Sequence, residues 1–220
     1  MTDKNLLYAH VLLDRSGSMM AIRQQTIDAV NEYVSGLAAD PDLDAVVSLT
    51  LFDDPSFGRV MDLVSVFDGI PVGEVESLTI GTYAPRGMTP LNDAIGQTVA
   101  LMRSQYHRPN EKIALVIVTD GLENASREYT APQVKALIES VQAEGWLVVY
   151  LGANQDSFAE GTAARGVRGQ SVMNFAPTHI KDAMGATLRS TRMYASGANA
   201  SDYGFQDAER LQAEGKSPEA

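Results

Sequence analysis

Residues 11 to 19 read Val-Leu-Leu-Asp-Arg-Ser-Gly-Ser-Met, so an apolar run stops at a carboxylate and two hydroxyls follow at alternate positions. In an extended or tightly turning segment, residues two apart point the same way, and Asp14, Ser16 and Ser18 are therefore expected to converge. Gly17 lets the backbone turn there without a clash from a Cβ atom. Three oxygen donors of this kind suit Mg²⁺ or Mn²⁺ better than zinc or copper, which prefer imidazole or thiolate. The stretch predicts a buried strand that ends in the start of a hard-cation site.

Two further segments supply the donors that this stretch lacks. Residues 87 to 93 read Gly-Met-Thr-Pro-Leu-Asn-Asp and place the hydroxyl of Thr89 in a loop just before an amphipathic helix. Residues 115 to 121 read Leu-Val-Ile-Val-Thr-Asp-Gly, a second apolar strand that ends in a carboxylate, here Asp120, followed by glycine. Each added donor thus lies where the chain leaves or enters a regular element, the setting that a metal motif requires.

In the order and spacing of these segments the chain resembles the von Willebrand factor A (VWA) family, whose metal ion-dependent adhesion site is written Asp-x-Ser-x-Ser, then Thr, then Asp. The resemblance covers roughly residues 5 to 195, most of the chain. The bacterial stand-alone members of the family also resemble it in residues 119 to 126, Thr-Asp-Gly-Leu-Glu-Asn-Ala-Ser, and in residues 151 to 156, Leu-Gly-Ala-Asn-Gln-Asp. These stretches extend the likeness beyond the metal motif itself.

The resemblance implies a complete set of metal ligands. Ser16, Ser18 and Thr89 would bind the ion through their hydroxyls, whereas Asp14 and Asp120 would bind it directly or through water. The expected ion is Mg²⁺, with Mn²⁺ or Ca²⁺ as alternatives. The resemblance also implies that an Asp or Glu of a protein partner completes the coordination, so that the metal bridges two proteins. The chain is therefore expected to be a metal-dependent protein-binding module and not an enzyme.

Patterns typical of strands and helices alternate along the chain. Apolar runs predict strands over residues 6–13, 46–52, 113–118, 146–151 and 171–175, and helical spacing and capping signals predict helices over residues 24–38, 94–103, 131–144, 157–165 and 179–194. The turn residues 53–56 and the run 58–66 predict a hairpin, hence an antiparallel edge strand. This alternation predicts an α/β fold, a doubly wound, Rossmann-like three-layer sandwich around a mostly parallel sheet.

The two candidate carboxylates occupy equivalent places in this expected fold. Ligands of open α/β sheets bind outside the carboxyl ends of strands, at the point where the strand order reverses. Asp14 and Asp120 both stand at the carboxyl end of a predicted strand. Because the motif match does not depend on this placement, the agreement supports the metal-site interpretation.

Length and local composition bear on domain organisation. A chain of 220 residues favours one α/β domain, residues 1–195, followed by a polar tail, residues 196–220. The tail is rich in Ala, Ser, Gly, Asn and charge, so we expect it to be frayed and flexible, with a helical turn around residues 207–213.

Composition also restricts partners and compartment. The 28 Asp and Glu against 17 Lys and Arg give a formal charge of −11, which repels phosphate backbones and anionic membranes, so neither nucleic acid nor a membrane is an expected partner. No apolar run approaches the roughly 20 residues of a transmembrane helix, and Asp3 stands where a secretory signal would be basic. The lack of cysteine excludes disulfides and Cys-based zinc sites, and it fits the cytoplasm.

Several acidic and amide residues near the motif have two interpretations. Asp53 and Asp54 could rim the metal site, but Asp-Asp-Pro is favourable turn chemistry and a turn is preferred. Asn124 could hold a water or a loop, although capping of the next segment is preferred. Asp93 is expected to cap the following helix or to favour its positive end.

Basic and methionine residues beside the motif are also open to two interpretations. Arg15 and Arg86 could meet an acidic partner, with solvated surface charge as the default. Three methionines flank the motif loops and could offer a soft contact surface, namely Met19, Met20 and Met88. The three histidines are scattered between different predicted elements and suggest no zinc cluster, namely His10, His107 and His179.

Two alternatives to a stand-alone binding module remain open. A metal-dependent hydrolase of the phosphatase kind could also use aspartates at strand ends, but a haloacid dehalogenase-like enzyme needs a second Asp where Ser16 stands. The sequence has no Gly-x-Gly-x-x-Gly, phosphate loop or Gly-x-Ser-x-Gly motif. The second alternative is an accessory subunit of an ATP-driven chaperone or chelatase, whose AAA-type ATPase would be a separate polypeptide.

Overall fold

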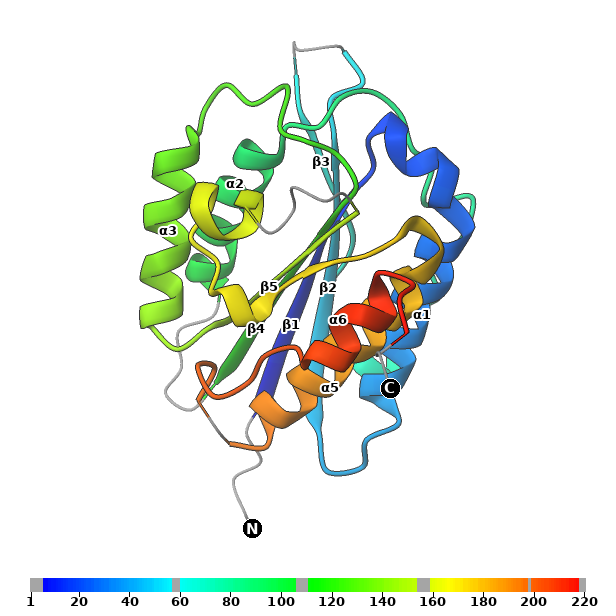
Figure 1. Cartoon of the computed structure of the whole chain (residues 1–220), viewed down its shortest axis with the longest axis vertical. Coiled ribbons are helices and arrows are strands. Elements are labelled where there is room, and N and C mark those ends of the chain that lie inside the picture. Colours follow the sequence, from blue (N-terminus) through cyan, green and yellow to red (C-terminus); the bar gives the residue numbers. More distant parts are fainter. Residues whose placement is uncertain (1–5, 57–59, 106–110, 154–158, 198, 218–220) are drawn as a thin grey trace.

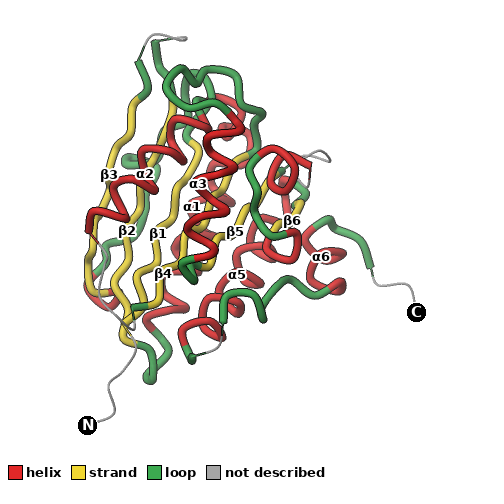
Figure 2. The backbone as a smooth tube through the Cα atoms, turned by 90° about the vertical axis from the view of Figure 1, so that its left-hand side faces the viewer, coloured by secondary structure: helices red, strands yellow, loops and turns green. Residues whose placement is uncertain are grey.

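A computed structural model describes residues 6–56, 60–105, 111–153, 159–197 and 199–217. Its centre is a six-stranded sheet with the strand order β3-β2-β1-β4-β5-β6 (Figures 1 and 2). The strands are β1 (Leu6–Asp14), β2 (Asp44–Asp53), β3 (Asp62–Pro71), β4 (Lys112–Thr119), β5 (Leu147–Gly152) and β6 (Val172–Asn174). Every neighbouring pair is parallel except β2 with β3, which is antiparallel at the edge. The predicted fold class is therefore confirmed.

Helices cover both faces of this sheet. The four long helices are α1 (Arg23–Ala38), α2 (Leu91–Gln105), α3 (Ala131–Ala143) and α5 (Ile180–Ala195). Figure 1 shows α2 and α3 on one side of the sheet and α1 and α5 on the other. Because side chains alternate along a strand, β1 serves both layers: Val11 and Leu13 join the core under α1 and α5, whereas Leu12 joins the core under α2 and α3. The result is the expected three-layer sandwich.

Most predicted elements agree with the observed ones to within about three residues, and two need comment. The sequence predicts the hairpin partner of β2 over residues 58–66, but β3 begins at Asp62 and continues to Pro71; residues 57–59 lie outside the described part of the chain. The helix expected over residues 157–165 also begins outside that part, since residues 154–158 are not described. Its described remainder contains a π-helical turn, Glu160–Ala164, and the chain leaves it at Gly166 with a φ of 71°. Glycine suits that left-handed conformation.

The segment after α5 packs against the domain, which differs from the frayed tail expected from composition. The predicted helical turn is confirmed as α6 (Asp207–Ala213), which lies beside α5 and β6 (Figure 2). Three apolar residues anchor the segment in the core, namely Ala200, Phe205 and Ala213. The division into a domain of residues 1–195 and a separate tail stays a prediction.

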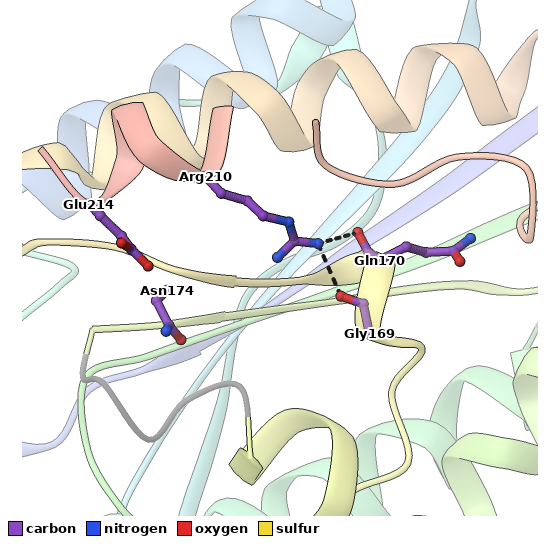
Figure 3. Close-up of a pocket in the computed structure, with 5 residues that line it drawn as sticks. All are labelled: Gly169, Gln170, Asn174, Arg210 and Glu214. Atoms are coloured by element: carbon purple, nitrogen blue, oxygen red, sulfur yellow. Dashed lines mark hydrogen bonds between the residues drawn. The ribbon is translucent and has the colours of Figure 1, made fainter. Parts of the chain in front are cut away.

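A polar anchor accompanies these apolar ones. The guanidinium of Arg210 donates to the backbone carbonyls of Gly169 and Gln170, at 3.0 and 3.1 Å (Figure 3). These three residues line a pocket of about 380 Å³ together with Asn174 and Glu214. Arg210 of α6 thereby satisfies carbonyls of the turn Gly169–Ser171, which leads into β6.

None of the helices in the described ranges is long and apolar enough to cross a bilayer.

The buried imidazole of His10 makes stability depend on pH. Its Nε2 lies 2.9 Å from the hydroxyl of Thr50, and burial lowers the pKa of His10 to about 4, although Asp68 opposes the shift. The unfolded chain binds the proton near pH 6.5, so the folded state loses stability as pH falls from 6.5 towards 4, by about 3 kcal/mol at most.

When the pH falls from 7 to 4.5, we therefore expect the free energy of unfolding to decrease less in His10→Gln than in the wild type. Urea unfolding at pH 7 and pH 4.5 measures the difference, and His179→Gln, which removes a more exposed imidazole, is the control. Parallel pH profiles for the wild type and His10→Gln would contradict this account.

Candidate metal centre

The candidate ligands meet at the carboxyl edge of the sheet, where the strand order reverses. Strand β1 ends at Asp14 and β4 ends at Thr119, and these two parallel strands are direct neighbours, with Leu13 opposite Val118. The chain leaves β1 towards β2 on one side, whereas β4 is followed by β5 on the other side. Figure 1 shows the loops after both strands at the same end of the molecule. The predicted location at the switch point of the sheet is thus observed.

The hydroxyls and one carboxylate lie within contact distance of one another. The Oγ atoms of Ser16 and Ser18 are 3.1 Å apart, and the Ser18 hydroxyl donates to Oδ1 of Asp120 at 2.6 Å. The hydroxyl of Thr89 comes from a third loop, and a Cβ atom built on Gly121 would lie 2.9 Å from Thr89 Oγ1 and 3.5 Å from Ser18 Oγ. The backbone of Gly121 therefore passes directly beside this oxygen cluster, where a side chain has no room.

Asp14 forms the buried floor of the cluster. Its Oδ1 accepts the backbone N–H of Ser16 and its Oδ2 accepts the hydroxyl of Thr119, both at 2.6 Å. The side chain is fully buried, and burial raises the pKa of Asp14 to about 7, against the effect of these hydrogen bonds. Burial also raises the pKa of Asp120, while the hydrogen bond from Ser18 lowers it. Both carboxyls lie where a nearby cation would favour the ionised form.

The oxygen spacing fits an octahedral hard cation. Neighbouring ligands of an octahedral Mg²⁺, with metal–oxygen distances near 2.1 Å, stand about 3.0 Å apart. The separations of 3.1 Å for Ser16 and Ser18 and of 2.6 Å for Ser18 and Asp120 bracket this value. The hydroxyl of Thr89 has no hydrogen-bond partner among the described residues and is available for such a role. The described ranges contain no group of three or more His, Cys, Asp or Glu side chains that could hold a metal, so hydroxyls are essential to any site here.

Asn124 ties the loop of Thr89 to the loop of Asp120. Its side-chain Oδ1 accepts the backbone N–H of Thr89 at 2.8 Å, and its own N–H donates to the Thr89 carbonyl at 3.2 Å. The preferred interpretation of Asn124 as a cap of the next segment is wrong, because the observed cap of α3 is Thr130. Two hydrogen bonds to one residue fix the position of Thr89 relative to Asp120.

The loop after β4 and the start of α2 cap each other. Asp93 lies in the first turn of α2, as expected for the positive end of a helix. Its carboxylate also accepts three backbone N–H groups of the loop, those of Arg127, Glu128 and Tyr129. In return Glu123 accepts the N–H of Asn92, and Ser126 accepts the N–H of Asp93. Sequence reasoning missed this role of Glu123 and Ser126, although both belong to the stretch that resembles bacterial VWA proteins.

The remaining candidates near the motif have separate structural roles. Asp54 accepts the N–H and the hydroxyl of Ser56, which confirms the turn. Asp53 contacts Arg15 and Arg86 instead, so neither arginine is the freely solvated charge assumed by default.

The structure places the methionines that flank the motif, and two of the three histidines, in different surroundings. Met19 is buried in the core, whereas Met20 remains 52% exposed. Among the described residues, neither His10 nor His179 belongs to a group of three or more His, Cys, Asp or Glu side chains that could hold a metal, and His107 lies outside the described part of the chain.

Comparison with known proteins identifies the fold. No protein-family model matches the sequence, and no curated protein sequence matches it. Among solved structures, proximal thread matrix protein 1 from the mussel byssus, with a zinc-occupied MIDAS motif, is similar at 15% identity, with a TM-score of 0.59 over 87% of this chain and 46% of that chain. A von Willebrand factor type A protein from Catenulispora acidiphila is similar at 14% identity, with a TM-score of 0.56 over 84% of this chain and 42% of that chain.

A third similar structure is the manganese-loaded TRAP protein of Plasmodium vivax, at 14% identity and a TM-score of 0.56 over 84% of this chain and 74% of that chain. The chain thus spans about half the length of the mussel protein, and its likeness to all three lies in the fold. The chain has the fold of a VWA domain.

Proposed function

We propose that this protein is a metal-dependent protein-binding module, in which a divalent cation, Mg²⁺ by preference, recognises an Asp or Glu carboxylate of a protein partner. The observation that carries the proposal is that three hydroxyls and two carboxylates gather at the switch point of the sheet. Ser18 Oγ lies 3.1 Å from Ser16 Oγ and 2.6 Å from Asp120 Oδ1, Thr89 lies beside the same glycine as Ser18, and Asp14 accepts the N–H of Ser16. The resemblance to the VWA adhesion motif and the VWA fold support it. The comparison structures with zinc and manganese are consistent with a divalent ion in such a site.

The ligands divide into two groups by charge and burial. Ser16, Ser18 and Thr89 would bind the ion directly through neutral hydroxyls. Both carboxylate oxygens of Asp14 already accept hydrogen bonds from protein groups, which favours a contribution through water. Asp120 is less buried than Asp14, and it shares a hydrogen bond with the ligand Ser18.

This donor set explains why the site would bind and not catalyse. When bound, a divalent cation with mainly neutral ligands supplies a strong positive centre for a further carboxylate. The lack of a side chain at Gly121 leaves that position open, because a Cβ atom there would lie 2.9 Å from Thr89 Oγ1 and 3.5 Å from Ser18 Oγ. A role beside a separate AAA-type ATPase would use the same binding site.

Magnesium binding can be tested with a nearly isosteric variant. Titration calorimetry with MgCl₂ should detect an ion bound to the wild type. At ten times the dissociation constant, the free energy of unfolding should rise by about 1.4 kcal/mol. Thr89→Val removes only the candidate ligand oxygen and should abolish the response with little change in the stability of the metal-free protein. An unchanged Mg²⁺ response in Thr89→Val would contradict the assigned ligand set.

Partner binding can be tested in the same two proteins. Immobilised wild type and Thr89→Val are exposed to a cell lysate in MgCl₂ and in EDTA. A protein retained only by the wild type in MgCl₂ should lose that retention when its contacting Asp or Glu is replaced by Asn or Gln. Equal retention in all conditions would show that the ion is not the bridge.

A further inference from the structure

Two arginines and two aspartates form a connected ion-pair cluster beside the candidate metal centre. Arg15 Nη2 lies 2.5 Å from Asp53 Oδ1, and Arg86 Nε lies 2.8 Å from Asp53 Oδ2, so the two cations share one carboxylate. Arg86 Nη2 also contacts Asp62 Oδ2 at 2.6 Å, and Arg15 Nη2 lies 3.7 Å from the same atom. Asp53 is 0% exposed, which makes its carboxylate the buried centre of the cluster.

The members of the cluster belong to the segments that build the metal centre. Arg15 stands between the candidate ligands Asp14 and Ser16, and Arg86 precedes the loop that carries Thr89. Asp53 ends β2 and faces Asp62, the first residue of β3, across the hairpin. The cluster therefore joins the loop after β1 to the segment before Thr89, and both to the end of β2.

Backbone hydrogen bonds run parallel to these ion pairs. The N–H of Arg86 donates to the carbonyl of Arg15 at 2.7 Å, and the N–H of Gly17 donates to the carbonyl of Gly87 at 3.1 Å. On the other side, Asp54 and Met88 exchange two backbone hydrogen bonds, at 3.0 and 3.1 Å. Residues 86–88 thus lie like a short strand between the first motif loop and the end of β2.

The ion pairs make the position of residues 86–88 matter for the charge balance of the cluster. The facing carboxylates of Asp53 and Asp62 repel each other unless cations separate them, and a fully buried carboxylate is costly unless it is paired and hydrogen-bonded. Arg15 and Arg86 meet both needs only while residues 86–88 lie against the loop after β1. Displacement of this segment would withdraw Arg86 and leave Asp53 with one cation.

We propose that Asp53 is a positioning residue that fixes the loop of Thr89 against the loop of Ser16 and Ser18. It touches no candidate ligand atom itself and acts through Arg15 and Arg86. The consequence for metal affinity rests on the proposed function, whereas the consequence for loop position does not. In this arrangement the spacing of the three hydroxyls is set before an ion binds.

The test compares Asp53→Asn with a matched loss of an ion pair elsewhere. Glu209 of α6 receives two hydrogen bonds from Arg189, at 2.6 and 2.7 Å, and lies outside the loops of the metal centre, so Glu209→Gln is the control. Amide hydrogen exchange of the metal-free proteins is measured at Gly17, Arg86 and Met88. Asp53→Asn should speed exchange at these loop amides at least tenfold relative to the amides of the sheet, and Glu209→Gln should not.

Metal affinity provides the second readout. Calorimetry with MgCl₂ should show affinity weakened about 10- to 100-fold in Asp53→Asn, the usual effect of removing a group that orients metal ligands, with no change in Glu209→Gln. Arg86→Gln replaces a half-exposed side chain and removes one of the two cations that contact Asp53. It should speed amide exchange and weaken Mg²⁺ affinity less than Asp53→Asn does. This variant therefore tests the proposal even if Asp53→Asn does not fold.

Unchanged exchange and unchanged affinity in both cluster variants would overturn the proposal. If the wild type itself binds no Mg²⁺, the proposed function fails, and the exchange rates alone then decide whether Asp53 positions the loop.

Discussion

Asp14→Asn should make the metal-free protein more stable while it abolishes the response to Mg²⁺. Substitution of a buried residue normally destabilises a fold. A gain in stability would therefore indicate that the Asp14 carboxylate serves binding and does not serve the stability of the fold. Burial raises the pKa of Asp14 to about 7. The ionised side chain therefore costs folding free energy that a neutral amide of the same shape does not.

The sign of this effect depends on pH. The folded protein binds a proton at Asp14 up to about pH 7, whereas the unfolded chain releases it near pH 3.8. Wild-type stability due to this group is therefore highest below pH 4 and falls as pH rises from 4 to 7, by a few kcal/mol at most. The advantage of Asp14→Asn should be greatest at pH 8 and should shrink towards pH 4.

The surroundings of Asp14 can accept the amide. Its oxygen can still accept the N–H of Ser16, and its NH₂ group can donate to the Thr119 oxygen, because the Thr119 hydroxyl has a second acceptor in the Gly121 carbonyl at 3.2 Å. The N–H of Ser16 and the hydroxyl of Thr119 therefore keep hydrogen-bond partners after the exchange, and the loss of such partners is the usual source of destabilisation in buried polar variants.

The measurement is urea unfolding in EDTA at pH 8 and pH 5, followed by thermal melting with MgCl₂. Asp44→Asn, at an exposed carboxylate of β2, serves as control and should behave as the wild type in every condition. A variant less stable than the wild type at pH 8 would show that the hydrogen bonds to Asp14 outweigh the cost of its burial.

The placement of Asp14, Ser16, Ser18 and Asp120 could be predicted from local pattern, whereas Thr89 was expected as a ligand from the resemblance to the VWA family. Asp14 and Asp120 each end an apolar strand, and adjacent parallel strands end at the same edge of a sheet. The alternation of Asp14, Ser16 and Ser18 adds a spacing that any tight turn brings together. Neither inference needs a contact between residues distant in the sequence, beyond the pairing of two strands.

The supports of the site were not predicted, because they consist of distant contacts. Asp53 meets Arg15 across 38 positions and Arg86 across 33, and Asn124 meets Thr89 across 35. Each of these residues has a plausible local role as a turn former, cap or solvated charge, and local pattern favours that role. Only the fold shows that the local role is displaced by a partner from another loop.

The segment after α5 illustrates the same limit in the core. Its polar composition predicted a frayed tail, since few apolar residues are available for burial. The structure nevertheless buries Phe205 and Ala213, and Arg210 satisfies carbonyls near β6 (Figure 3). A few buried or hydrogen-bonded side chains are thus enough to pack the segment against the domain, although its average composition predicts no such packing.

Gly87→Ala should be the most damaging small substitution near the metal centre. Gly87 has a φ of 69°, in the left-handed region that disfavours side chains, and a Cβ atom there would lie 2.2 Å from the carbonyl oxygen of Asp54. That oxygen accepts the N–H of Met88, so neither partner can withdraw without breaking the short strand-like pairing. The clash adds about 1–3 kcal/mol to a backbone strain of about 1–2 kcal/mol, so we expect a total loss of about 3 kcal/mol.

A second glycine separates strain from clash. Gly145, which follows α3, has a φ of 97° and no atom within 4 Å of a Cβ atom built on it, so Gly145→Ala carries backbone strain alone. Urea unfolding of both variants measures the loss, and calorimetry with MgCl₂ measures the site. Gly145→Ala should lose about 1–2 kcal/mol and bind Mg²⁺ as the wild type does.

Gly87→Ala should lose more stability and should also lose Mg²⁺ affinity, because relief of the clash must move residues 86–88 away from Asp54. Movement in that direction displaces Thr89, the next residue along the chain, from Ser18 and Asp120. Equal losses in the two glycine variants, with Mg²⁺ binding intact in both, would mean that the loop of Thr89 yields without disturbing the hydroxyls. We do not expect that result, because residues 86–88 form backbone hydrogen bonds to the loop after β1 on one side and to Asp54 on the other. The segment therefore cannot move without breaking hydrogen bonds beside the candidate ligands.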